Sequence, residues 1–124
     1  MRGARLTVAL AATIALALPA TASSAGASIQ VSPRQVRAGN VVTVSGSAEG
    51  CPIGDYMTLL SPAFKHVHDF AGVPAIYTPV RADGSFDQMV RIPRRRAKGN
   101  YSISGRCGGG NLGVTAKLRV LPRR

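Results

Sequence analysis

The sequence predicts an all-β fold, a sandwich of two sheets made of about seven short strands. Apolar and polar residues alternate with a period of two through most of the chain from position 28 onward, and no apolar stripe has helical spacing. The 14 Gly and 8 Pro residues supply turn signals between the alternating runs. Short strands separated by turns at this spacing are typical of a two-sheet sandwich.

Each expected strand has one apolar face. In chain order, the apolar positions are Ile29 and Val31, then Val42, Val44 and Ala48, then Met57 and Leu59, then Phe86, Val90 and Ile92, then Tyr101, Ile103, Gly105 and Cys107, and finally Val114, Ala116, Leu118 and Val120. Turns are expected at 38–40, 83–84 and 98–100, where Gly and Asn or Asp gather. The stretch between Leu59 and the turn at 83–84 is less regular.

The N-terminal region has the parts of a secretory signal peptide. Two arginines precede an apolar run at 6–18, and small residues then form A-x-A cleavage patterns at 20–22 and 25–27. The run is shorter than the roughly 20 residues that span a bilayer, and no Cys stands directly after it to carry a lipid. We therefore expect a signal peptide at 1–27, with the choice between the two sites open, and one released extracellular domain at 28–124.

The protein is strongly basic. Sixteen Lys and Arg residues face five Asp and Glu, which gives a formal net charge of +11. The densest run lies between strands and comprises Arg91, Arg94, Arg95, Arg96 and Lys98. It is either a solvated loop, which the sequence alone favours, or a loop that binds polyanions such as wall teichoic acids, extracellular DNA or anionic lipid headgroups. No aromatic residues are interleaved with these arginines, so sequence-specific nucleic-acid binding is not expected.

The two cysteines predict one disulfide. Cys51 and Cys107 lie in the part expected to be exported, where an even cysteine count indicates a bridge. With the strands lettered in order, Cys51 ends the second (B) and Cys107 ends the sixth (F). In an immunoglobulin-like (Ig-like) sandwich B and F lie on opposite sheets, so the bridge would join the sheets. The sequence has no Trp and no tyrosine corner, so the likeness to antibody domains concerns architecture only.

Several segments also carry a family resemblance. Val31-Ser32-Pro33, the stretches 41–54 and 81–86, Ile92-Pro93 and the stretch 99–120 resemble the exported Ig-like domains common in actinobacteria. The resemblance covers nearly the whole expected mature chain and implies a non-catalytic domain whose two cysteines are paired. A looser similarity is to the neocarzinostatin-type apoproteins, sandwiches that carry a small chromophore. Those proteins have two cysteine pairs, and their binding loops do not align with this chain.

A glycine-rich loop follows the second cysteine. Its candidate ligand-contacting residues are Gly108, Gly109, Gly110, Asn111 and Leu112. The run contains a formal G-x-G-x-x-G, but a strand rather than a helix is expected after it, which argues against a dinucleotide site. The loop is either a hairpin turn whose backbone demands glycine or a bare backbone that a ligand can approach.

The cluster of catalytic residue types is small. His66 and His68 would share one face of a strand, but Asp69 would point away and the sequence has no third His, so we expect no metal site. No G-x-S-x-G elbow occurs, and the five carboxylates do not suggest a catalytic pair. We expect no catalytic residues and no cofactor.

These observations lead to one main functional expectation. The chain is expected to be a secreted, monomeric, non-catalytic Ig-like domain that acts as an extracellular binding or interaction module. One alternative is a small-ligand carrier that uses the end holding Cys51 and the glycine-rich loop. Another is a cationic protein that binds anionic envelope polymers through the arginine-rich loop. The partner would be such a polymer or an extracellular protein.

Overall fold

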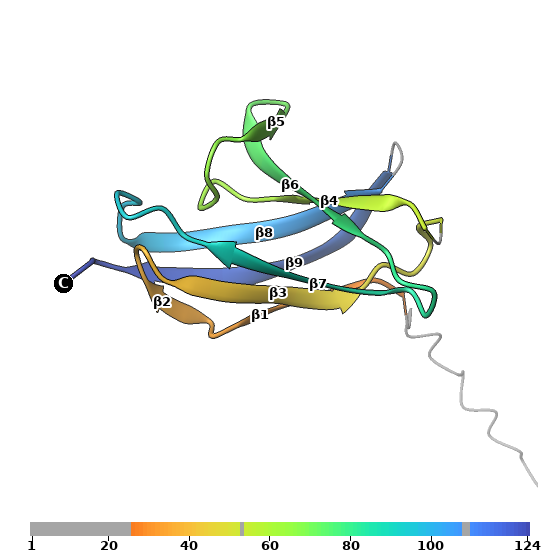
Figure 1. Ribbon diagram of the computed structural model, residues 1–124, viewed down its shortest axis with the longest axis horizontal. Helices are drawn as coiled ribbons and strands as arrows, with labels where there is room; N and C mark the ends of the chain where they lie inside the picture. Colours follow the sequence, from red (N-terminus) through yellow and green to blue (C-terminus); the bar gives the residue numbers. More distant parts are fainter. Residues whose placement is uncertain (1–25, 53, 108–109) are drawn as a thin grey trace, which may run out of the picture.

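The protein is built from two β-sheets. The computed structural model describes residues 26–52, 54–107 and 110–124, and these contain strands but no helix (Figure 1). The strands are β1 (Ser28–Ser32), β2 (Gln35–Arg37), β3 (Val41–Ser47), β4 (Tyr56–Leu60), β5 (His68–Phe70), β6 (Val73–Pro79), β7 (Ser85–Arg91), β8 (Gly99–Cys107) and β9 (Gly110–Leu121). Within these ranges there is no helix with the length and apolarity that a membrane span requires.

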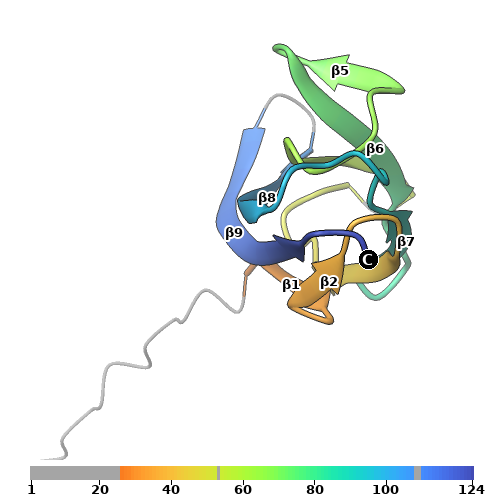
Figure 2. The same ribbon diagram turned by 90° about the vertical axis from the view of Figure 1, so that its left-hand side faces the viewer.

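The strands pair into a three-stranded sheet of order β1-β3-β7 and a six-stranded sheet of order β2-β9-β8-β4-β6-β5. All pairs are antiparallel except β2 with β9. The two sheets face each other, and Figure 2 shows the molecule turned by 90°. The short strands β1 and β2 follow each other in the chain yet belong to different sheets, so the chain crosses from one sheet to the other at 33–34.

The core lies between the sheets and confirms the predicted alternation. Val42 and Val44 of β3 are almost fully buried, as are Leu59 of β4, Ile103 of β8 and Leu118 of β9. These side chains belong to one cluster with residues from both sheets. Because alternate residues of each strand enter this cluster, the remaining residues of these strands face outward.

Two sequence expectations about strands need correction. The irregular stretch after Leu59 contains the hairpin of β5 and β6, which pairs with β4. Cys51 does not end a strand: β3 stops at Ser47, and the backbone N–H of Cys51 donates to Ala48 O at 2.9 Å in a turn. The turn forms at Glu49-Gly50, where Gly50 has a φ of +94°, and this backbone conformation cannot continue a strand.

The predicted disulfide is present. Cys51 and Cys107 are bonded, and their Cα atoms lie 5.7 Å apart. Cys51 lies in the connection that follows β3, a strand of the three-stranded sheet. Cys107 is the last residue of β8, a strand of the six-stranded sheet. The bond therefore ties the two sheets together at one end of the sandwich.

Removal of this bond is expected to destabilise the protein. Cys51 and Cys107 are 56 residues apart in the chain, and closing a loop of that size lowers the entropy of the unfolded chain. The double variant Cys51→Ser/Cys107→Ser should lose about 4 kcal/mol in free energy of unfolding. Urea unfolding followed by circular dichroism measures this difference, and an unchanged unfolding midpoint would contradict the assigned role.

Candidate functional site

One end of the sandwich gathers four segments that are distant in sequence. They are 34–40, 61–65, 91–100 and 117–124, and hydrogen bonds join them. The backbone N–H of Arg119 donates to Arg34 O at 2.8 Å, and that of Gly39 donates to Ile92 O at 2.9 Å. The guanidinium of Arg96 donates to Phe64 O at 2.8 Å. We call this part of the molecule the cationic end.

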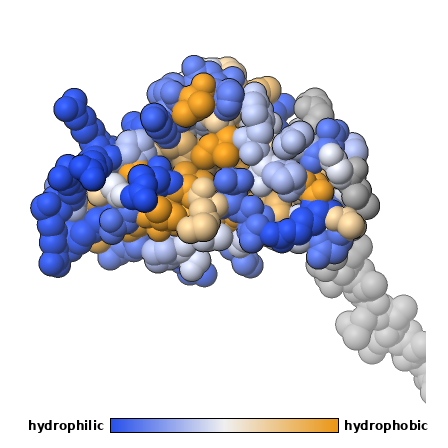
Figure 3. Space-filling view, in the orientation of Figure 1, coloured by the Kyte–Doolittle hydropathy of each residue, from blue (hydrophilic) through white to orange (hydrophobic). Residues whose placement is uncertain are grey.

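Positive charge is concentrated at the cationic end, and none of its four segments contains Asp or Glu. Its basic residues are Arg34, Arg37, Lys65, Arg91, Arg94, Arg95, Arg96, Lys98, Lys117, Arg119, Arg123 and Arg124. In Figure 3, strongly hydrophilic residues cover the left-hand side of the molecule, which is the side where the C-terminus lies in Figure 1. The structure thus places the predicted loop of Arg91, Arg94, Arg95, Arg96 and Lys98 in a larger cluster that extends to β2, β9 and the C-terminus.

The opposite end has a different charge balance. Glu49, Asp55 and Asp83 lie in its loops, and backbone hydrogen bonds join these loops, for example from Ala48 to Gly84 and from Val80 to Asp55. The protein therefore carries its basic cluster at one end of the strands and most of its loop carboxylates at the other end.

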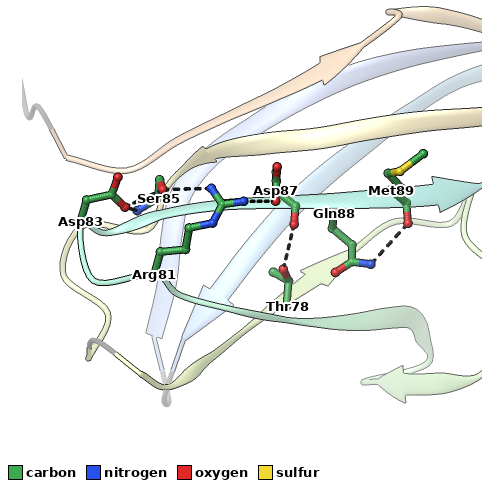
Figure 4. A network of polar contacts seen from close by, with 7 residues as sticks. All are labelled: Thr78, Arg81, Asp83, Ser85, Asp87, Gln88 and Met89. Carbon is green, nitrogen blue, oxygen red and sulfur yellow. Dashed lines mark hydrogen bonds and ion pairs between the residues drawn. The ribbon is translucent and has the colours of Figure 1, made fainter.

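At that opposite end, the Arg81 side chain is held in a local network of polar contacts (Figure 4). The guanidinium of Arg81 lies between Ser85 and Asp87 and contacts both. The hydroxyl and the backbone N–H of Ser85 donate to Asp83 Oδ1 at 2.6 and 2.9 Å. These two hydrogen bonds lower the pKa of Asp83. Since Arg81 is already paired with a carboxylate, it adds little to the field that a distant polyanion meets.

Two groups can be distinguished among the cations of the cationic end. Arg37, Arg91 and Arg96 donate to backbone carbonyls at 2.8 to 3.2 Å and so hold the segments together. Arg95 and Lys98 are exposed. The first group builds the site, while the second presents charge to solvent.

Two open grooves lie beside these cations. One, the β1–β9 groove, has a volume of about 600 Å³ and is lined by Ile29, Gln30, Val31, Ser32, Arg34, Ser45, Ala116 and Lys117. The other, the β8–β9 groove, has a volume of about 510 Å³ and is lined by Lys98, Gly99, Asn100, Arg119, Val120, Leu121 and Pro122. Each groove therefore joins basic side chains to a partly apolar lining.

The glycine-rich loop forms the connection of a hairpin. Cys107 pairs with Gly110 and Arg106 pairs with Asn111, while Gly108 and Gly109 lie outside the described residues. Leu112 is half-buried and packs against the core. Neither groove described above includes a residue of this loop.

The predicted geometry of the histidine cluster was wrong in one respect. Asp69 does not point away, because β5 begins only at His68 and the chain before it is not extended as a strand. His66 Nδ1 and Asp69 Oδ1 therefore lie 2.6 Å apart in an exposed pair. His68 instead packs against Tyr77, with ring centroids 4.9 Å apart. Among the residues that the structure describes, no group of three or more His, Cys, Asp or Glu could hold a metal.

Sequence reasoning missed a set of exposed aromatic residues on the outer face of the six-stranded sheet. Tyr56, Phe70 and Tyr77 are 63%, 42% and 49% exposed, and they come from β4, β5 and β6. The guanidinium of Arg106 lies over the Phe70 ring, 4.8 Å from its centroid. The signal was hidden because the β5–β6 hairpin itself was not predicted.

Comparison with known proteins informs the fold only. No known family model matches the chain, and no curated protein matches it. The solved structure of Pseudomonas fluorescens alkylpurine DNA glycosylase AlkC, bound to DNA containing an abasic site analog, is similar with a TM-score of 0.54 and 14% identity. The match covers 75% of this chain and 29% of that chain. A likeness at this identity concerns the arrangement of strands and not the ligand.

The structure separates the roles of two adjacent arginines. Arg96 is half-buried and donates to the carbonyls of Ala63 and Phe64, two buried residues. Arg96→Ala should lower the free energy of unfolding by about 2 kcal/mol because both carbonyls lose their donor. Arg95→Ala, at an exposed position, should change it by less than about 0.5 kcal/mol. Urea unfolding of both variants tests this difference, and equal midpoints would disprove it.

Proposed function

We propose that this protein is a secreted, non-catalytic, Ig-like binding module whose cationic end holds polyanionic polymers of the cell envelope. The observation that carries the proposal is the concentration of basic side chains in segments that contain no carboxylate. Neighbouring cations reinforce one another's attraction for a polyanion within a Debye length, which is about 8 Å at physiological salt. The fold brings segments together whose cations would otherwise act separately.

The strand order supports the Ig-like part of the proposal. In Ig-like sandwiches strands A, B and E share one sheet with an edge strand, and strands C, F and G share the other. Here β1, β3 and β7 form one sheet, and β4, β8 and β9 are neighbours in the other. The disulfide joins the connection after β3 to β8, close to the B and F positions of that architecture.

Secretion is supported by the disulfide and by the position of β1 relative to the expected cleavage pattern. A disulfide persists in oxidising, extracellular surroundings. The first strand of the described residues begins at Ser28, directly after the A-x-A pattern at 25–27. Cleavage at that pattern would leave every described strand intact.

The alternative of a small-ligand carrier at the glycine-rich loop receives less support. Leu112 contributes to packing against the core, and the two grooves lie beside the cationic side chains. We propose a sequence-independent attraction for polyanions and no readout of bases.

The salt dependence of binding tests the proposal. Polyphosphate serves as the probe, and titration calorimetry at several salt concentrations gives the slope of log association constant against log salt. Arg95→Gln should reduce the magnitude of this slope by about 1, and Arg95→Gln/Lys98→Gln by about 2. Each substitution removes one cation, so binding of the variant displaces one counterion fewer from the polyphosphate.

Arg81→Gln is the matched control because it removes the same charge from the opposite end, where Arg81 is paired with Asp87. Its slope should equal that of the unaltered protein. Binding that does not vary with salt, or an equal effect of Arg95→Gln and Arg81→Gln, would refute the assignment to the cationic end.

A further inference from the structure

We infer that the β1–β9 groove binds a hydroxylated anionic chain, so that the polymer held at the cationic end is an acidic polysaccharide. This inference rests on the proposed function and narrows its ligand class. The neutral polar side chains that line the groove support it, because a site that attracts its ligand by charge alone would not need them.

The groove lies where the two sheets come together beside β1. It takes Gln30 and Ser32 from β1 and Ser45 from β3, and it reaches Ala116 and Lys117 on β9 in the other sheet. Gln30 and Ser45 are direct partners in the β1–β3 pairing. An amide and two hydroxyl groups therefore line one wall of an open groove of about 600 Å³.

These neutral groups match sugar hydroxyls better than phosphate oxygens. A Ser hydroxyl and a Gln amide each offer both a donor and an acceptor. A sugar hydroxyl also offers both, so it can satisfy either function of these side chains. Polyphosphate offers acceptors alone at neutral pH, which would leave the Gln and Ser acceptors without a partner from the ligand.

Two cations lie at the groove for the acidic groups of the same chain. Arg34 is exposed and follows β1. The ammonium of Lys117 donates to Ser102 Oγ at 2.7 Å, and since an ammonium has three donors, this bond orients it without using all of them. Ile29, Val31 and Ala116 form the floor of the groove and belong to the core, so the groups that a ligand could bind are mainly the polar and charged ones.

The second groove lacks this combination. The lining of the β8–β9 groove includes Lys98 and Arg119 but only one neutral polar side chain, the amide of Asn100, and no hydroxyl. The β8–β9 groove therefore suits attraction of an anion by charge. The β1–β9 groove adds side chains that can both donate and accept hydrogen bonds.

The test removes neutral groups and leaves the charge unchanged. Gln30→Ala/Ser45→Ala and the single variant Gln30→Ala are titrated with a heparin oligosaccharide and with polyphosphate, over a range of salt. The double variant should bind heparin about tenfold more weakly, as expected for the loss of two hydrogen bonds. Its affinity for polyphosphate should fall less, because only the donors of these two side chains can bond to phosphate oxygens. Both salt slopes should stay the same, because no cation is lost.

The matched control is Gln88→Ala/Thr115→Ala, which also removes one amide and one hydroxyl, from positions outside both grooves. It should bind both probes as the unaltered protein does. Gln30 is exposed on an edge strand, so the single variant should fold even if the double variant does not. It should bind heparin about threefold more weakly, as expected for the loss of one hydrogen bond.

The outcomes separate the two proposals. Salt-dependent binding of both probes with no effect of the groove substitutions would overturn the groove and leave the cationic end standing. An equal loss for heparin and polyphosphate would overturn the preference for hydroxylated chains. Failure of both probes to bind would overturn the proposed function and this inference together.

Discussion

The burial of one apolar face of each sheet against the other is the constraint on which the structure depends. β3, β7, β8 and β9 place inward-facing side chains in the shared core, so the outward residues of these strands are available for other uses. The disulfide secures this arrangement at one end only. At the other end the backbone is held by hydrogen bonds, many of them donated by arginine side chains.

The passage of the chain between the sheets shapes the candidate site. β1 pairs with β3 in one sheet, and β2 pairs in parallel with the end of β9 in the other. This crossing brings Arg34 and Arg37 beside the C-terminal segment, with Arg37 donating to Pro122 O at 3.0 Å. The crossing also leaves the side of β1 next to β9 open, where the larger groove forms. The charge cluster and the groove have the same topological origin.

The sequence pattern predicted the buried faces of several strands and the disulfide, since each follows from the residues of one strand or from the number of cysteines. The alternation at β3, β8 and β9 predicted their buried residues, since a sheet with one covered face selects apolar residues at every second position. The cysteine count predicted the disulfide because only one pairing is possible. The hairpin of β5 and β6 was missed because β5 is exposed throughout and β6 contains Pro74 and Pro79, which weaken a strand pattern.

The candidate site depended on information that a local pattern does not hold. The sequence predicted one arginine-rich loop, but Arg119 and Arg34 meet only through pairing between distant segments. The run of adjacent arginines also concealed a division of roles. Arg96 is directed to the carbonyls of a segment more than thirty positions away, whereas Arg95 faces solvent. Nothing in the run itself distinguishes them.

The separation of charge along the strands has a consequence for orientation. The cationic end and the end with the disulfide lie at opposite ends of β8, since Gly99 pairs with β9 near the C-terminus and Cys107 closes the far hairpin. A molecule attached to an anionic surface by its cationic end would stand upright, with its strands pointing away from that surface. The outer tip would then be the β8–β9 hairpin. The beginning of β1 would also lie distal, because Ser28 pairs with the last residue of β3. Attachment would thus present one defined tip of the protein to its surroundings.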